Sequence, residues 1–231
     1  YCLHAELKIE GRQVDSTHIT LGFRSISIDG EKGFFLNGEN IKINGVAKHQ
    51  DYDGVFNATK QEHWNQDICD ILEIGANSVR LSHYQHPQEM YCLCDKYGLI
   101  VWAEIPMLKM TENEALLENA CSQLKELILQ NIHHPSICFW GIQNEIAMFG
   151  ENQGMYEKVK RLADLAKQLD PSRISSCANL FCVKNDSMLN TFTEAVGYNI
   201  YFGWYYGEMK DSETFVEKFH EDNPHISLGI T

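Results

Sequence analysis

The chain has 231 residues, 44% of them hydrophobic, and a formal net charge of −13 at pH 7. This apolar content is enough for a sizeable core. The negative charge argues against a nucleic-acid partner and offers no basic patch for a membrane surface. No apolar run is long enough to cross a membrane as a helix. The sequence starts at Tyr1 without a signal peptide, and we expect it to be part of a longer chain.

The cysteines do not have the spacing of a disulfide framework or of a zinc site. Eight are present, no two of them form a C-x-x-C pair, and none is spaced from a histidine as zinc ligands are. Cys69, Cys121 and Cys138 fall on apolar faces or runs instead. We therefore expect free thiols in a reducing compartment, and hence a cytoplasmic protein.

Residues 1–29 have the pattern of β-strands. Apolar and polar residues alternate over residues 4–10 and again over residues 19–28, and Asp29-Gly30 marks a turn. Because two strands alone are marginally stable, we expect further strands upstream. Residues 34–43 then predict a hairpin with Asn37-Gly38 near its tip.

Strands and helices alternate from about residue 41 onward. The predicted strands cover residues 41–47, 77–81, 99–102, 137–142, 173–177, 196–200 and 226–230. The predicted helices cover residues 59–74, 87–97, 114–131, 153–169 and 212–220. Thr59 and Glu62, three residues apart, have the pattern of a capping box at the start of the first helix.

About seven such repeats, with polar residues after each strand, predict an α/β fold. The fold expected over residues 30–231 is a (β/α)₈ TIM barrel that is incomplete at its C-terminus, lacking the last strand and helices. An open, doubly wound sheet is the alternative. It is disfavoured because no Gly-rich phosphate-binding loop follows the first strand.

In such a barrel the strand ends meet at one mouth, so the polar residues that follow the strands form one candidate site. These residues are His49, Asp51, Arg80, His83, Glu104, Asn144, Glu145, Asn199 and Tyr201. Glu145 directly follows a buried apolar run, where a carboxylate is costly unless it is solvated, paired or used. It is either a structural ion-pair partner of an Arg or Lys, or a general acid/base with Asn144 holding a substrate hydroxyl.

Several short motifs occur in a fixed order: NGVAKHQD (44–51), NSVRLSHY (77–84), LCDKYGL (93–99), HPS (134–136) and WGIQNE (140–145). Together they resemble the catalytic barrel of glycoside hydrolase family 2, from about residue 20 to the C-terminus. The segments LSHYQ (81–85) and WAEIP (102–106) are most similar to bacterial β-galactosidases of that family. The resemblance implies that residues 1–29 are the C-terminal strands of an immunoglobulin-like β-sandwich. It is also compatible with a homo-oligomer of the full-length enzyme.

The family hydrolyses β-glycosides with retention, using two carboxylates about 5 Å apart. By resemblance Glu145 is the acid/base, which protonates the leaving oxygen and then activates water. The family's nucleophile is a Glu at the end of the seventh strand, and residues 226–231 contain none. We expect it immediately or almost immediately after Thr231, and we expect this chain by itself to be inactive.

The resemblance also implies roles around the sugar. Arg80 would hold the nucleophile carboxylate ionised, unless it only forms an ion pair with Glu104. His49 and His83 would donate hydrogen bonds to sugar hydroxyls, and Asp51 would accept one, with a structural role as the alternative for each.

Four residues later in the chain complete the set of binding residues. Asn144 is expected to contact the sugar 2-hydroxyl, and Tyr201 is expected beside the nucleophile, with Asn199 as its neighbour. Trp204, in an aromatic cluster after the sixth strand, either stacks on a sugar or packs at the rim.

The expected partner is a β-linked galactoside or oligosaccharide. A β-glucuronidase or β-mannosidase of the same family is one alternative, and a non-catalytic carbohydrate-binding barrel is the other. Some β-galactosidases of the family bind Mg²⁺ near the acid/base. The pattern here departs from theirs after Glu104, where Ile105-Pro106 follows, so no metal or other cofactor is expected.

Overall fold

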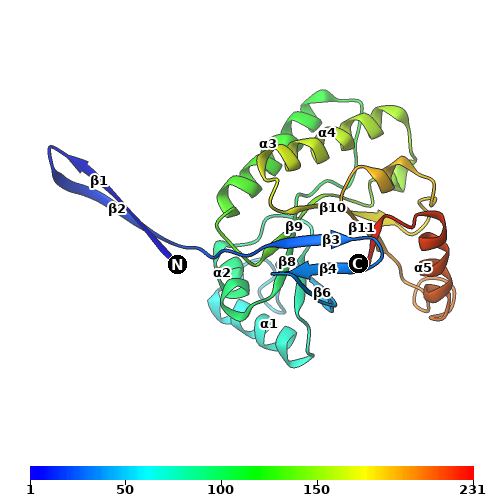
Figure 1. Cartoon of the computed structure of the whole chain (residues 1–231), viewed down its shortest axis with the longest axis horizontal. Coiled ribbons are helices and arrows are strands. Elements are labelled where there is room, and N and C mark those ends of the chain that lie inside the picture. The colour runs from blue at the N-terminus through cyan, green and yellow to red at the C-terminus, as the bar shows by residue number, and fades with distance from the viewer.

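The computed structural model describes all residues from 1 to 231 and has three parts (Figure 1). A two-stranded ribbon projects away from the rest of the molecule, and a small three-stranded sheet lies against the body. The body is a curved sheet of seven strands with helices on its outer face. None of the helices is long and apolar enough to span a membrane.

The strands of the body run parallel and pair in sequence order. They are β6 (Gly45–Lys48), β7 (Ser78–Leu81), β8 (Ile100–Glu104), β9 (Ile137–Asn144), β10 (Ile174–Leu180), β11 (Ala195–Asn199) and β12 (Ser227–Ile230). The helices are α1 (Gln61–Glu73), α2 (Gln88–Tyr97), α3 (Glu114–Asn131), α4 (Gln153–Leu169) and α5 (Asp211–Asp222), with 3₁₀ turns η1 (Ile146–Phe149) and η2 (Met188–Thr191). Parallel strands in sequence order inside a layer of helices are the arrangement of a (β/α)₈ barrel. The predicted fold, an incomplete TIM barrel, is confirmed, and β6 and β12 are its two free edges.

The strands in the middle of the sheet are buried on both faces, as parallel strands covered by helices require. In β8, Val101 and Ala103 belong to the large core between the sheet and the helices. Ile100 and Trp102 alternate with them and belong to a smaller core on the inner face of the sheet. This alternation explains why the strand segments are recognisable as short continuous apolar runs.

The predicted bounds of α3 and α4 agree with the structure, but the predicted capping box of the first helix is wrong. α1 begins after Lys60, whose backbone N–H donates to His63 Nδ1 at 3.0 Å. The Thr59 hydroxyl instead accepts a hydrogen bond from Trp64 Nε1 at 3.0 Å. A contact with a tryptophan side chain therefore replaces the capping of backbone amides, and Glu62 stays exposed.

The small sheet consists of β3 (Ile26–Asp29), β4 (Gly33–Leu36) and β5 (Glu39–Asn40), paired antiparallel. At the tip of its second hairpin Asn37 and Gly38 have φ of +53° and +84°, the conformation that the Asn-Gly pair predicts. Phe34 packs against Phe139 of β9, with ring centroids 5.5 Å apart. The small sheet therefore covers the inner core at the amino ends of the barrel strands.

The projecting ribbon is formed by β1 (Cys2–Ile9) and β2 (Arg12–Thr20), which pair only with each other and are exposed on both faces. β3 lies within residues 1–29, yet it pairs with β4 and not with the ribbon. The assignment of residues 1–29 to a β-sandwich stays a prediction.

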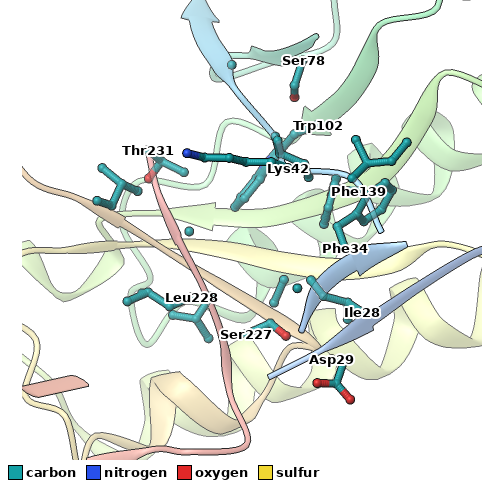
Figure 2. Close-up of a pocket in the computed structure, with 18 of the residues that line it drawn as sticks. Ile28, Asp29, Phe34, Lys42, Ser78, Trp102, Phe139, Ser227, Leu228 and Thr231 are labelled. Atoms are coloured by element: carbon teal, nitrogen blue, oxygen red, sulfur yellow. The ribbon is translucent and has the colours of Figure 1, made fainter. Parts of the chain in front are cut away.

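A cavity of about 940 Å³ opens between the free edges β6 and β12 (Figure 2). Trp102 and Phe139 line it from the sheet, Phe34 from the small sheet, and Leu228 from β12. The interior of an eight-stranded barrel of this kind is filled by side chains. We therefore interpret this cavity as the interior of the open barrel rather than as a ligand pocket.

Candidate active site

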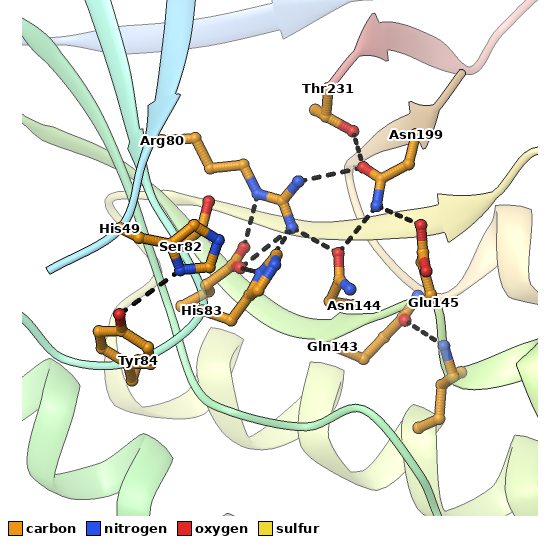
Figure 3. A network of polar contacts seen from close by, with 12 residues as sticks. His49, Arg80, Ser82, His83, Tyr84, Gln143, Asn144, Glu145, Asn199 and Thr231 are labelled. Carbon is orange, nitrogen blue, oxygen red and sulfur yellow. Dashed lines mark hydrogen bonds and ion pairs between the residues drawn. The ribbon is translucent and has the colours of Figure 1, made fainter. Parts of the chain in front are cut away.

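Polar side chains at the carboxyl ends of the barrel strands meet in one network (Figure 3). Arg80 comes from β7, Glu104 from β8, Asn144 from β9 and Asn199 from β11, and none of the four is more than 7% exposed. Parallel strands place their carboxyl ends at the same face of a barrel. Residues as far apart in sequence as Arg80 and Asn199 therefore come within hydrogen-bonding distance, at 3.1 Å.

The central contact of the network is a buried ion pair between Arg80 and Glu104. Arg80 Nε donates to Glu104 Oε2 at 2.9 Å and Nη2 donates to Oε1 at 3.0 Å, so the pair is bidentate. His83 Nδ1 lies 2.5 Å from Glu104 Oε1 and, as the donor, completes the shell of this fully buried carboxylate. Only glycine fits at position 141, because a side chain there would collide with Trp102 and Glu104.

The remaining N–H groups of Arg80 fix the orientation of two amides. Nη2 donates to Asn144 Oδ1 at 2.8 Å, and Nη1 donates to Asn199 Oδ1 at 3.1 Å. The Thr231 hydroxyl also donates to Asn199 Oδ1, at 2.7 Å. Because its oxygen accepts from both donors, the amide nitrogen of Asn199 must point the other way, where it donates to Glu145 Oε1 at 2.7 Å.

Glu145 follows the last residue of β9 and has a left-handed backbone, with φ of +50°. A non-glycine residue adopts this conformation only when its surroundings hold it there. Its backbone N–H donates to the carbonyl oxygen of Ala178 in β10 at 2.7 Å. The carboxylate is half-buried at the mouth of the barrel, where it can reach both the network and a bound molecule.

His49 and Asp51 lie at the rim, outside the buried network. The rings of His49 and His83 meet edge to face, with centroids 5.0 Å apart. Partial burial, followed by the neighbouring His83, lowers the pKa of His49. Asp51 is exposed and makes no hydrogen bond with the network, but its charge acts on His49 in the opposite direction.

Tyr201 and Trp204 follow β11 on the other side of Glu145. Burial, and next the Glu145 carboxylate, raises the pKa of the Tyr201 phenol. Trp204 is 76% exposed and stacks on Tyr205, with ring centroids 5.0 Å apart. Tyr201 contacts Trp204 edge to face, so the exposed indole is one aromatic ring away from the neighbourhood of Glu145.

Sequence reasoning places Glu104 in the candidate site and names it as the alternative partner of Arg80, and that ion pair is present. It misses Thr231, which no motif marks, and it misses Gln143. The signal for Gln143 is a polar residue inside the apolar run of β9, where it is fully buried.

The network does not have the composition of a metal site. No group of three or more His, Cys, Asp and Glu side chains is arranged to hold a metal ion. Both oxygens of Glu104 are occupied by Arg80 and His83, so this carboxylate has no free oxygen for a cation. The residues present therefore do not fit Mg²⁺, which requires near-octahedral oxygen ligands.

Comparison with known proteins gives consistent matches. The family model described as "Glycosyl hydrolases family 2, TIM barrel domain" matches residues 26–227. A β-glucuronidase of Bacteroides fragilis is 39% identical over 239 residues, which cover 100% of this chain and 34% of that protein. A β-galactosidase of Thermoanaerobacter pseudethanolicus is 31% identical over 175 residues, which cover 75% of this chain and 23% of that protein.

Among solved structures, the crystal structure of an FMN-binding β-glucuronidase from Faecalibacterium prausnitzii L2-6 superposes with a TM-score of 0.96 at 38% identity. The superposition covers 100% of this chain and 36% of that one. The chain thus spans about a third of the length of these two β-glucuronidases.

Proposed function

Because the chain belongs to glycoside hydrolase family 2, we propose that the full-length protein hydrolyses terminal β-glycosides with retention of configuration and that Glu145 is its acid/base. The observation that carries the proposal is the setting of Glu145. It directly follows a buried strand, has a strained backbone, and receives a hydrogen bond from an amide that Arg80 orients. A side chain held this way is ready to transfer a proton to an atom at the barrel mouth.

Retention requires a second carboxylate about 5 Å from the first. Glu104 is a poor candidate because it is fully buried and both its oxygens are held by Arg80 and His83. Glu217 and Glu221 lie in α5, away from the strand ends. We place the nucleophile at the carboxyl end of β12, beside Thr231, whose hydroxyl already contacts Asn199.

In this scheme Glu145 protonates the glycosidic oxygen while the nucleophile attacks the anomeric carbon, and the leaving group departs. Glu145 then removes a proton from the water that hydrolyses the glycosyl intermediate. Arg80, through Nη1 and Nη2, holds Asn144 and Asn199 beside Glu145. Asn144 is positioned for the sugar 2-hydroxyl, while His49, His83, Asp51, Tyr201 and Trp204 surround the ring of the sugar.

The motifs favour a galactoside, whereas the 39% identical relative and the solved structure with a TM-score of 0.96 are named β-glucuronidases. We therefore propose a β-glucuronide as the first substrate and a β-galactoside as the second, the latter supported by the name of a 31% identical relative. Arg80 is already paired with Glu104, so a sugar carboxylate would need cationic or amide groups outside this network.

The test is hydrolysis of aryl β-glucuronide, β-galactoside and β-mannoside by the full-length protein, with this chain alone assayed alongside. Turnover of the glucuronide, with this chain inactive, supports the substrate and the missing nucleophile together. Turnover of only the galactoside or mannoside keeps the mechanism and overturns the substrate. No turnover of any glycoside, together with retained sugar binding, would favour a non-catalytic carbohydrate-binding barrel.

A further inference from the structure

Gln143, two residues before Glu145, is a fully buried amide that the proposed chemistry does not use. Its Oε1 accepts a hydrogen bond from the backbone N–H of Ile146 at 3.1 Å. Its Nε2 donates to Asn179 Oδ1 in β10 at 2.8 Å. The side chain therefore binds the residue that follows Glu145. Figure 3 shows Gln143 with Asn144 and Glu145 in the network.

A chain of buried amides fixes which way Gln143 points. Asn190 Oδ1 accepts from Asn179 Nδ2 at 3.0 Å and from the Tyr198 hydroxyl at 2.8 Å, while Asn190 Nδ2 donates to two backbone carbonyls. Burial raises the pKa of Tyr198 to about 12, so its hydroxyl remains a donor. With Asn190 fixed, Asn179 must present its oxygen to Gln143, and Gln143 must present its own oxygen to Ile146.

The two peptide groups on either side of Glu145 are thus held by different partners. The peptide before it is held by the carbonyl of Ala178, which accepts from the Glu145 N–H at 2.7 Å. The peptide after it supplies the Ile146 N–H, which is held by Gln143. A non-glycine residue in the left-handed region is strained, so these contacts must oppose relaxation of the Glu145 backbone.

We propose that Gln143 is a positioning residue that holds the Ile146 amide and thereby fixes the direction in which Glu145 presents its carboxylate to the leaving oxygen. The catalytic part of this inference rests on the proposed function. Gln143 does not contact the substrate, and it acts only through the backbone of Glu145. A misplacement of 1 Å can cost about a hundredfold in rate. The loss should fall on substrates whose leaving group must be protonated.

The test uses Gln143→Met in the full-length protein, because methionine has a similar length but makes neither hydrogen bond. The matched control is Asn131→Leu. Asn131 is also fully buried, and its amide also makes two side-chain hydrogen bonds: it donates to Leu127 O and accepts from Gln88 Nε2, both at 2.7 Å. It lies at the end of α3, before β9 begins, and it makes no contact with the network.

The first readout is hydrogen exchange of the Ile146 amide, which needs no activity. We expect exchange at least about tenfold faster in Gln143→Met and unchanged in Asn131→Leu, because only the first variant removes the acceptor of Ile146. Unchanged exchange in Gln143→Met would overturn the inference. Hydrogen exchange can be measured even if the protein hydrolyses none of the glycosides in the panel. Failure of the proposed function can therefore be distinguished from failure of this inference.

The second readout is kcat/KM for a nitrophenyl and a methyl β-glycoside of the accepted sugar. We expect Gln143→Met to lose about 10- to 100-fold on the methyl glycoside and little on the nitrophenyl glycoside, whose leaving group needs no proton. If Gln143→Met loses the same factor in kcat/KM on both glycosides, or if Asn131→Leu shows the same difference between them, the positioning role would be overturned.

Gln143→Glu serves if the methionine variant does not fold. A protonated carboxyl can donate to Asn179 and accept from Ile146, as the amide does, whereas an ionised one cannot donate. The ratio of the two kcat/KM values should match the wild type at acidic pH and diverge as the buried carboxyl ionises. A ratio that does not change with pH relative to the wild type would contradict the inference.

Discussion

Asn199 Nδ2 lies 2.7 Å from Glu145 Oε1, although Asn199 ends β11, Glu145 follows β9, and β10 lies between these two strands. The register of the sheet makes this contact, since Asn144 pairs with Ala178 in β10 and Leu180 pairs with Asn199 in β11. Asn199 cannot turn its oxygen toward Glu145, because that oxygen accepts from Arg80 and Thr231. The carboxylate therefore has a donor as its partner on the inner side, and the residue is partly exposed at the mouth.

We expect Glu145→Gln to lose about 10²- to 10⁴-fold in kcat/KM on a methyl β-glycoside, because it removes the proton donor while keeping the shape of the side chain. The loss on a nitrophenyl glycoside should be smaller at the glycosylation step. Steady-state assays of the full-length protein with both substrates measure this difference. Glu118→Gln is the matched control, an exposed carboxylate on α3 with no contact to the network. Equal activity of Glu145→Gln and the wild type would exclude Glu145 as the acid/base.

Removal of Arg80 should destabilise the fold as well as the site. Arg80→Ala leaves Glu104 buried without its bidentate partner, and we expect a loss of about 3–5 kcal/mol in the free energy of unfolding. Urea unfolding of the full-length protein measures it. In the control Lys160→Ala, an exposed pair with Asp164 is lost, and the change should stay below about 1 kcal/mol. Similar losses in the two variants would show that the buried pair contributes no more than a surface pair.

The strand ends of the barrel could be predicted because each short apolar run stops at a polar residue. Asn144 and Asn199 end such strands and Arg80 lies one residue before the end of β7, so the barrel geometry brings the three together. The start of α1 could not be predicted from local pattern, because Thr59 is recruited by Trp64 instead of by backbone amides. Here a contact within the folded helix overrides the local capping preference.

The conformation of Glu145 was also beyond local reasoning. Its left-handed backbone depends on a shift in the register between β9 and β10, which places the Ala178 carbonyl opposite its N–H. The holding contact from Gln143 depends in turn on Asn179 and Asn190, which lie 36 and 47 positions further along the chain. Contacts between residues so far apart in sequence leave no periodic pattern. The only sequence signal for them is a glutamine within the apolar run of β9.

His86 predicts how stability depends on pH. It is buried, Nε2 faces the Ser82 carbonyl at 3.2 Å, Nδ1 has no partner, and burial lowers its pKa to about 4. Between pH 6.5 and 4 the unfolded chain binds a proton at this residue and the folded chain does not, so stability falls as the pH falls. The loss in the free energy of unfolding that is due to His86 should reach about 3 kcal/mol at pH 4.

Urea unfolding at a series of pH values measures this slope in the wild type and in His86→Gln, which keeps a donor for Ser82 but cannot titrate. The variant should lose less stability on acidification over that interval, whatever the other groups contribute. His225→Gln, at an exposed histidine, controls for the loss of a histidine elsewhere. Parallel curves for the wild type and His86→Gln would show that His86 does not carry this dependence.

Trp204 tests whether the aromatic cluster after β11 takes part in binding. Because it is 76% exposed, Trp204→Ala should leave the unfolding midpoint unchanged. If the indole stacks on the substrate, the loss of about 0.5–1.5 kcal/mol should raise KM about 2- to 12-fold with kcat nearly unchanged. Tyr97→Ala, an aromatic residue 45% exposed at the end of α2, is the control with no expected effect on KM. An unchanged KM in Trp204→Ala would assign the indole to the rim of the barrel and leave the sugar to be held by polar groups, with Asn144 and His83 as the nearest candidates.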